Sequence, residues 1–398
     1  MSSAAELDDR ALAEKPAIDV ARPQVAHKID SALLKIVAAS GMSPLQVMRD
    51  YVGLAFGPGR ISFKDYSELR LFDGAFWAGA ERRQVVGHQR NVAINRIVNY
   101  RYDWWGMLDN KIATCSYLAA YGLPVIPAVA VYCDRLKTGA RNVVSDEDEL
   151  RKILTDEANY PMFGKPAEGL QSLGSIGLRC YRAQDRMLET HEGRLVALDS
   201  LVEQVRTHYR SGYVLQKFLS PHAAVRALCG DRLATVRMIT LTTEAGPKLF
   251  RACWKIPAGG NMADNYWRKG NLLAKIDMTQ GEVQRVLSGS GLDLATHERH
   301  PDTGAALIGF RIPHWQRMVD TVIEAARLMQ HVPMIGWDVA ALDQGPVIVE
   351  MNERPDFFLP QIADGRGILE PALTDFMAAQ KRKQAADKKG KPTGKRAA

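Results

Sequence analysis

Hydrophobic and polar positions follow different patterns in the first and later parts of the chain. Residues 29–52 place hydrophobic side chains at helical spacing with one break at a glycine, and Ser43 followed by Pro44 is typical of a helix start. Helical, more polar segments continue to residue 105. We therefore expect a helical N-terminal region over residues 29–105, preceded by a flexible arm at residues 1–28.

Beyond residue 105, short strands alternate with helices. The strands are indicated by β-branched and alternating runs, and the helices by apolar residues at every third or fourth position. The predicted strands are residues 125–132, 162–166, 178–181, 213–219, 233–243, 250–256 and 272–277. The predicted helices are residues 112–121, 146–154, 198–209, 315–329 and 370–379. The sequence shows no internal repeat.

Residues 336–352 are predicted to form a β-hairpin. Residues 347–349 are a β-branched run, and residues 343–346 carry the Gly and Pro of a turn. We expect a three-residue loop, residues 343–345, in which Gly345 supplies the left-handed backbone position.

The predicted hairpin gathers polar side chains on one face. With that loop, Leu342 pairs with Pro346, and Asp338 then lies opposite Glu350. Glu350 and Asn352 are two residues apart, so they point to the same face of their strand. An oxygen-only cluster of this kind suits Mg²⁺, which takes one or two carboxylates plus substrate phosphates. The alternative is a solvated hairpin end whose acids only keep the strand soluble.

A Gly/Ser-rich loop forms the second candidate site. Residues 162–166 are a short strand that carries Lys165, and the loop of residues 169–177 contains three glycines and two serines. The backbone N–H groups of such a loop can fold over phosphate oxygens. The loop lacks the GK[ST] step into a helix that defines a Walker motif, and glycine-rich hairpin loops without a ligand are frequent.

Composition is ordinary for a soluble globular protein, and the net charge lies in one segment. The 398 residues are 46% hydrophobic and 24% charged, with a formal net charge of +7. Residues 381–398 alone carry this charge, so residues 1–380 are neutral and give no reason to expect a specific nucleic-acid groove. We expect this basic tail to be disordered, and either simply solvated or in contact with anionic surfaces.

Cysteine usage and hydropathy indicate a cytoplasmic protein. The five cysteines are scattered without a CxxC pair, which favours reduced thiols over a disulfide framework or a zinc site. The N-terminus has no signal-peptide apolar core, and no run reaches the ~18 apolar residues of a membrane span.

The order of motifs resembles the ATP-grasp superfamily, and most closely the group called sugar-transfer-associated ATP-grasp. The matching stretches are NKIATCSYLAAYGLPV, FGKPAEGLQSLGSIGL, YVLQKFL, LATVRMITL, ADNYWRKGNLLAKID and GWDVAALDQGPVIVEMNERPDF, which span roughly residues 105–362. Each motif is weak alone, but six in this order are specific.

The resemblance implies an α+β, ATP-grasp fold, in which two α+β lobes sandwich ATP after a helical N-terminal region. The ATP-grasp domain would occupy residues 106–380. Its N-terminal lobe, residues 106–212, would carry the phosphate loop, and its C-terminal lobe, residues 213–380, would carry the metal hairpin. Residues 381–398 would remain as the disordered tail.

The resemblance also implies roles in nucleotide binding. Lys111 and Lys165 would contact the ATP phosphates as point charges. The loop would cover the β- and γ-phosphates through Gly169, Ser172, Gly174 and Ser175. Adenine would be held, largely by backbone groups, at the strand end formed by Gln216, Lys217, Phe218 and Leu219.

Metal-binding and catalytic roles come from the same resemblance. Asp338, Glu350 and Asn352 would hold two Mg²⁺ ions, with Glu350 bridging them and Mn²⁺ as an alternative metal. Arg237 and Lys165 would stabilise charge on the transferred γ-phosphate. The acceptor side would be lined by Asn265, Arg268 and Lys269.

Three positions depart from the superfamily pattern. Gln216 stands where many ATP-grasp ligases have an acid, and Gly336 stands where many have an arginine two residues before the first metal aspartate. Arg237 is a candidate substitute for that arginine. A ribose-binding acid is also missing, and His222 lies in the segment where it is expected.

The implied reaction is ATP-dependent ligation. A carboxylate would attack the γ-phosphate to give an acyl phosphate, and an amine, less often a thiol or hydroxyl, would displace phosphate, so that ADP and phosphate are released. The group's name points to sugar-linked carboxylates and amines in polysaccharide or glycoconjugate biosynthesis. Two alternatives stay open: a kinase of the same fold that phosphorylates a small molecule or sugar, and a non-catalytic nucleotide-binding module.

Overall fold

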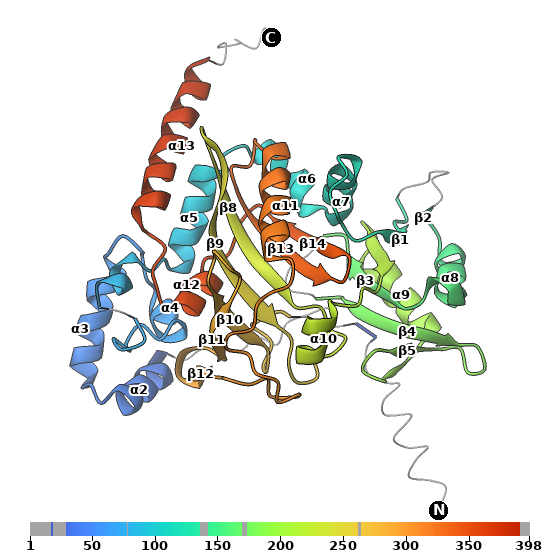
Figure 1. The fold of residues 1–398 in the computed structure, drawn as a ribbon, viewed down its shortest axis with the longest axis horizontal. Coiled ribbons are helices and arrows are strands. Elements are labelled where there is room, and N and C mark those ends of the chain that lie inside the picture. The colour runs from blue at the N-terminus through green and yellow to red at the C-terminus, as the bar shows by residue number, and fades with distance from the viewer. Residues whose placement is uncertain are drawn as a thin grey trace, which may run out of the picture.

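Two β-sheets, with helices around them, form the body of the protein (Figure 1). The computed structural model describes residues 17–18, 29–77, 79–135, 142–168, 173–261 and 264–390. The strand order is β2-β1-β7-β3-β4-β5-β6 in the first sheet and β12-β11-β10-β9-β8-β13-β14 in the second. The α+β fold expected from the motifs is confirmed, with a helical N-terminal region ahead of two sheets.

The first sheet is built from the middle of the chain. Its strands are β1 (Ala128–Tyr132), β2 (Val143–Val144), β3 (Met162–Pro166), β4 (Ile176–Arg182), β5 (Met187–Thr190), β6 (Leu195–Ala197) and β7 (Tyr213–Lys217). Helices α8 (Glu147–Thr155) and α9 (Leu198–His208) cover one face, where Leu150 and Leu201 share a hydrophobic core with Tyr213 and Leu215. Because side chains alternate along a strand, Gln216 points to the opposite face.

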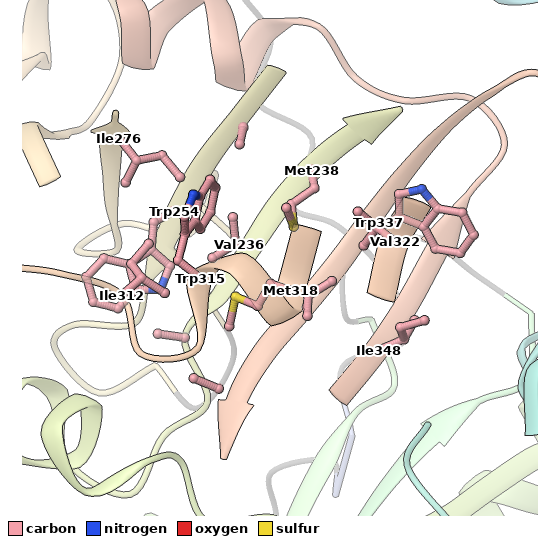
Figure 2. Close-up of a cluster of buried hydrophobic side chains, with 14 of the residues drawn as sticks. Val236, Met238, Trp254, Ile276, Ile312, Trp315, Met318, Val322, Trp337 and Ile348 are labelled. Atoms are coloured by element: carbon pink, nitrogen blue, oxygen red, sulfur yellow. The ribbon is translucent and has the colours of Figure 1, made fainter. Parts of the chain in front are cut away.

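The second sheet contains the longest strands. They are β8 (Thr235–Thr243), β9 (Gly246–Ile256), β10 (Leu272–Ile276), β11 (Val283–Ser288), β12 (Ala295–Thr296), β13 (Met334–Leu342) and β14 (Gly345–Asn352). The amphipathic helix α11 (Trp315–Leu328) packs on one face. There, Met318 and Val322 meet Val236, Met238 and Trp337 in a large buried core (Figure 2).

The N-terminal helices and the C-terminal helices cover the other face of the second sheet. They are α2 (Ile29–Ser40), α3 (Pro44–Ala55), α4 (Phe63–Glu68), α5 (His88–Val98), α12 (Phe358–Asp364) and α13 (Pro371–Gly390). Ile36, Tyr66 and Trp77 share a core with Cys253 and Leu273 of the sheet. The short helices elsewhere are η1 (Gly79–Gln84), η2 (Tyr102–Trp104), η3 (Glu157–Asn159), α10 (Ala223–Cys229) and η4 (Gly291–Asp293). None of the described helices is long and apolar enough to cross a membrane.

The sheet pairing moves the predicted lobe boundary. β7 pairs with β1 and β3, so the strand at residues 213–217 belongs to the first sheet and not to the C-terminal lobe. Leu108 of α6 (Trp105–Asp109) and Leu118 of α7 (Lys111–Ala120) instead pack in the core of the second sheet. Both differences arise because contacts between segments far apart in sequence, such as the pairing of β7, leave no mark in the local hydrophobic pattern.

The described parts of both terminal segments differ from the expectation. α13 runs to Gly390 and not to residue 379, so residues 381–390 of the expected disordered tail are helical. Eight of these ten residues are Lys, Arg, Gln or Ala, which favour helices. Within the expected flexible arm, Ala17 and Ile18 are buried in the first core, and Arg194 donates to the Ala17 carbonyl at 2.6 Å. The rest of the arm and residues 391–398 lie outside the described residues.

The β13–β14 hairpin has the predicted pair of Asp338 with Glu350 but a different turn. Leu342 pairs with Gly345, so the loop contains two residues and the predicted three-residue loop is wrong. The register then shifts between Asp338 and Val339, where β14 contains one extra residue as a bulge. The bulge cancels the difference in the turn, and Asp338 lies opposite Glu350 as predicted.

Gly164 on β3 offers a test of this packing. A Cβ atom there would lie 2.7 Å from the hydroxyl oxygen of Tyr213, which is fully buried. We expect Gly164→Ala to lower the free energy of unfolding by about 1–3 kcal/mol because the extra methyl overpacks the core. In Gly53→Ala, the matched control on α3, a Cβ meets nothing within 4 Å, and stability should rise by roughly 0.5–1 kcal/mol. Urea denaturation measures both, and equal midpoints for Gly164→Ala and wild type would contradict the account.

Candidate active site

A cavity of roughly 310 Å³ is lined by residues from both sheets. The first sheet contributes Phe163, Lys165 and Gln216. The second sheet contributes Thr235, Arg237, Lys255, Asp338, Val349, Glu350 and Asn352. A cavity of this size with a few convergent polar groups is typical of a small-molecule site.

A buried carboxylate and two cations connect three neighbouring strands of the second sheet. Arg237 of β8 binds both oxygens of Asp338 on β13, with Nε 2.6 Å from Oδ1 and Nη2 3.0 Å from Oδ2. Lys255 of β9 donates to Asp338 Oδ2 at 3.1 Å and lies 3.4 Å from Asp264 Oδ1. Asp264 in turn accepts the backbone N–H of Thr235 at 2.8 Å. Burial by itself raises the pKa of Asp338, but the two cations outweigh burial and lower the pKa to about 2.

This network engages two residues for which the sequence predicts other partners. Asp338 is predicted to bind metal, but both of its carboxylate oxygens bind protein cations. Arg237 is predicted to face the γ-phosphate, and it lines the cavity while its guanidinium is held by Asp338. The two residues are directly opposite each other in the β8–β13 pairing, a register that the sequence does not reveal. A ligand that reached Asp338 would compete with both ion pairs.

Two lysines lie on another side of the cavity. Lys165 on β3 is 7% exposed, and it has no ion pair with any described residue. Burial lowers the pKa of Lys165, and the nearby Glu350 opposes this shift. Lys111, the first residue of α7, has its Nζ 3.8 Å from Glu350 Oε1. Because a buried ammonium is costly without a balancing charge, this side of the cavity favours an anionic ligand.

The Gly/Ser loop contributes to the same cavity. Ser175 lines it, and the Gly174 carbonyl accepts a hydrogen bond from the Tyr213 hydroxyl at 2.9 Å. Gly174 has a φ of +76°, a backbone conformation that favours glycine. Gly169 and Ser172, the other two predicted loop residues, lie outside the described residues.

Glu350 and Asn352, two of the three predicted metal ligands, line the cavity and have side chains that could bind a metal ion. The Glu350 side chain is 32% exposed, and the buried Asn352 Nδ2 has no hydrogen-bond partner among the described residues. No group of three or more His, Cys, Asp or Glu that could hold a metal occurs in the described parts of the chain. One carboxylate and one amide fit Mg²⁺ if phosphate oxygens of a ligand supply further ligands.

The four residues predicted to hold adenine all line the cavity, but two of their side chains are engaged in the protein. Gln216 Nε2 donates to the Ile126 carbonyl at 3.4 Å. Lys217 Nζ donates to the Ala158 carbonyl of η3 at 3.1 Å. These side chains therefore shape the wall of the cavity.

Backbone groups and apolar side chains make up the rest of the predicted adenine site. The Phe218 N–H donates to the Pro161 carbonyl at 3.0 Å, so it is not free for a ligand. The Leu219 N–H has no hydrogen-bond partner among the described residues. Apolar contacts are provided by Ile126, Phe163, Leu233 and Val349. An unpartnered N–H beside apolar side chains suits the edge and faces of a flat heterocycle.

Another part of the cavity wall includes residues that were not predicted from the sequence. Asn265 lines it as expected, whereas Arg268 and Lys269 are not among the lining residues. The missed residues are Thr235, Lys255, Asp264, Trp267, Arg354 and Asp356. Some lie within the quoted motif stretches, but the pairing of β8 with β9 and the folded loops between β9 and β10 and after β14 bring them to the cavity.

Removing the Asp338 charge tests whether the second sheet depends on it. Asp338→Asn leaves two buried cations without their carboxylate, and we expect it to lower the free energy of unfolding by about 3–5 kcal/mol. The matched control, Asp103→Asn, breaks the exposed ion pair with Arg101 and should change stability little. Denaturant unfolding at pH 7 measures both variants, and a small effect at Asp338 would contradict the structure.

The difference in stability between wild type and Asp338→Asn is expected to depend on pH. The pKa of Asp338 in the folded protein, about 2, lies below the ordinary value of 3.8. The contribution of this carboxylate to stability is therefore complete above pH 3.8 and is lost as the pH falls toward 2. We expect the stability gap between wild type and Asp338→Asn to narrow over that window, and a gap that widens there would contradict the assignment.

Several solved structures of enzymes are similar to this chain at low sequence identity. The ATP-grasp ligase PsnB in complex with a minimal precursor is 15% identical, with a TM-score of 0.37. The match covers 71% of this chain and 64% of PsnB. D-alanine–D-alanine ligase from Bacillus anthracis is 14% identical, with a TM-score of 0.40 and coverage of 71% and 70%. Biotin carboxylase from Campylobacter jejuni is 10% identical, with a TM-score of 0.41 and coverage of 69% and 46%. The chain therefore spans less than two thirds of PsnB and of the biotin carboxylase.

The sequence itself places the chain in a family. No curated protein gives a significant match. The profile of one family, described as sugar-transfer associated ATP-grasp, matches residues 89–376. This match covers more than half of the chain, including both sheets and the cavity between them. The protein belongs to the sugar-transfer associated ATP-grasp family.

Proposed function

We propose that the protein is an ATP- and Mg²⁺-dependent ligase. It activates a carboxylate as an acyl phosphate for attack by an amine, and it releases ADP and phosphate. The observation that carries this proposal is the buried Lys165 ammonium, which has no ion pair with a described residue and shares a cavity with Glu350 and Asn352. A nucleotide phosphate supplies the missing negative charge, and the family membership favours ATP as its source.

The proposed nucleotide position follows from the chemistry of the cavity wall. Ile126 and Phe163 would provide apolar contacts for adenine, and the Leu219 N–H would be a hydrogen-bond donor to it. The phosphates extend toward Lys111 and Lys165. Ser175 and its loop neighbours add donors to the phosphate oxygens, as a flexible glycine-rich segment can.

The proposed metal site is shared between protein and nucleotide. Glu350 and Asn352 would hold Mg²⁺, or Mn²⁺, together with phosphate oxygens, and the ion would neutralise phosphate charge. Asp338 would be the third metal ligand only if Lys255 or Arg237 no longer bound one of its carboxylate oxygens. A second ion, bridged by Glu350, is part of the same proposal.

The remaining chemistry needs alignment more than covalent help from the protein. A carboxylate oxygen attacks the γ-phosphorus, the bond to the ADP oxygen breaks, and the charge that builds up is stabilised by Lys165 and Arg237. The amine then attacks the acyl carbon and phosphate leaves. We place this reaction in polysaccharide or glycoconjugate biosynthesis, on sugar-linked substrates, because of the family's association with sugar transfer.

The test is release of ADP and phosphate from Mg-ATP with pools of carboxylates and amines, each supplied alone and together. We expect turnover only with both pools, and Glu350→Gln should reduce turnover at least about 100-fold because it removes charge from the metal site. Glu244→Gln, at an exposed turn between β8 and β9, is the matched control and should keep wild-type turnover.

Two other results would replace the ligase proposal. ADP formation with a single substrate and no free phosphate would identify a kinase. No turnover and no ATP binding, with Glu350→Gln behaving as wild type, would leave a module that does not use the nucleotide.

A further inference from the structure

Asp356 is a carboxylate that lines the cavity and differs from the other acids there in its ionic contacts. The other lining acids are paired: Asp338 with Arg237, Asp264 with Lys255, and Glu350 with a lysine. Asp356 has no ion pair with a described residue, although it lines the cavity.

The backbone fixes the Asp356 carboxylate in place. The Phe358 N–H donates to Asp356 Oδ1 at 2.9 Å at the start of α12. Its position therefore comes from the protein, while its charge is left for something else to balance.

Lys165 and Asp356 line the same cavity, Lys165 from β3 of the first sheet and Asp356 from the segment that follows β14 of the second. The cavity thus contains one positive and one negative side chain without an ion-pair partner among the described residues. A substrate set that includes an anion and a cation would balance both.

An aromatic ring lies beside this negative charge. Trp267 lines the cavity together with Asp356, is 38% exposed, and is among the groups that oppose the rise in the pKa of Asp356. Contacts with Tyr266, at 5.4 Å between ring centroids, and with Phe358, at 6.4 Å, hold the indole in place. A carboxylate next to an exposed aromatic face is a combination that binds ammonium groups, through charge and through the ring quadrupole.

We propose that Asp356 and Trp267 receive the second substrate as an ammonium ion, and that Asp356 removes a proton from it before it attacks. The inference rests on the proposed ligase function and deepens it: the acceptor is a primary amine that enters in its charged form. Asp356 is then a catalytic residue for the second half of the reaction, and Trp267 is a binding residue.

The proton balance of this step is complete. Asp356 takes one proton from R–NH₃⁺, and the nitrogen lone pair of R–NH₂ then forms a C–N bond with the acyl phosphate carbon. The C–O bond to phosphate breaks, and the second proton leaves the nitrogen for the departing phosphate. The product is a secondary amide, and Asp356 returns its proton to water.

The environment of Asp356 suits a proton acceptor. Burial raises the pKa of Asp356, while the Phe358 N–H, Arg237, His88 and a hydrogen bond from Trp267 oppose this rise. The direction is upward, which makes the carboxylate a stronger base than an exposed aspartate.

Two assays separate the amine step from the carboxylate step. Both use Mg-ATP, a panel of amino acids and hexuronic acids as carboxylates, and wild type beside Asp356→Asn and Asp356→Glu. The first supplies hydroxylamine, which is mostly uncharged at neutral pH and traps an acyl phosphate as a hydroxamate. The second supplies amino acids and glucosamine as amines and follows phosphate release against pH. Asp375→Asn, on the exposed side of α13, is the matched control.

We expect Asp356→Asn to affect the two assays differently. Hydroxamate formation should stay within about threefold of wild type, while kcat/KM for the amine should fall at least about 100-fold at pH 7. In the variant, that kcat/KM should rise about tenfold per pH unit, because the amine must lose its proton in water. Asp356→Glu should restore part of the amine reaction.

Three results would count against this inference. Equal losses in both assays, or no loss in either, would show that Asp356 does not serve the amine. The third result concerns wild type: it could hydrolyse ATP, or transfer phosphate from it, and form no hydroxamate from any carboxylate. That result would contradict the ligase proposal itself, and the inference with it.

Discussion

The ion pair of Asp338 with Arg237 and Lys255 is the interaction on which the second sheet and the cavity both depend. It joins β13, β8 and β9 at the wall of the cavity, through side chains that are almost fully buried. A buried carboxylate that has lost its water needs both cations, and each cation needs the carboxylate. The two cations are therefore largely neutralised before a ligand arrives. Lys165 of the first sheet has no such carboxylate partner among the described residues, so its positive charge remains for an anionic ligand.

This arrangement divides the tasks between the two sheets. The first sheet brings the buried ammonium of Lys165 and the glycine-rich loop, and the second brings Glu350, Asn352 and, after β14, Asp356. A ligand that satisfies these groups must reach across the cavity from one sheet to the other. Binding energy is then available to fix the relative position of the sheets, and alignment of bound reactants is the main source of rate in phosphoryl and acyl transfer.

The sequence predicts what depends on local spacing. The 3.6-residue and two-residue periods locate most helices and strands, and the pairing of Asp338 with Glu350 is correct although the loop between them is one residue shorter. What the sequence cannot supply is register between distant strands. The contact of Arg237 with Asp338 depends on how β8 pairs with β13, and the lobe that contains β7 depends on its pairing with β3. The place of Asp356 in the cavity could not be predicted because one acid in a loop has no periodic pattern.

The central claim, that the cavity binds Mg-ATP through the buried Lys165 ammonium, is tested most directly by equilibrium binding. Isothermal titration of a non-hydrolysable ATP analogue with Mg²⁺ would compare wild type, Lys165→Met and Lys64→Met, whose lysine is exposed on α4. The account predicts at least about tenfold weaker binding for Lys165→Met, and unchanged binding for Lys64→Met. Equal affinity of all three proteins would contradict it, because the buried charge would then have no part in holding the nucleotide.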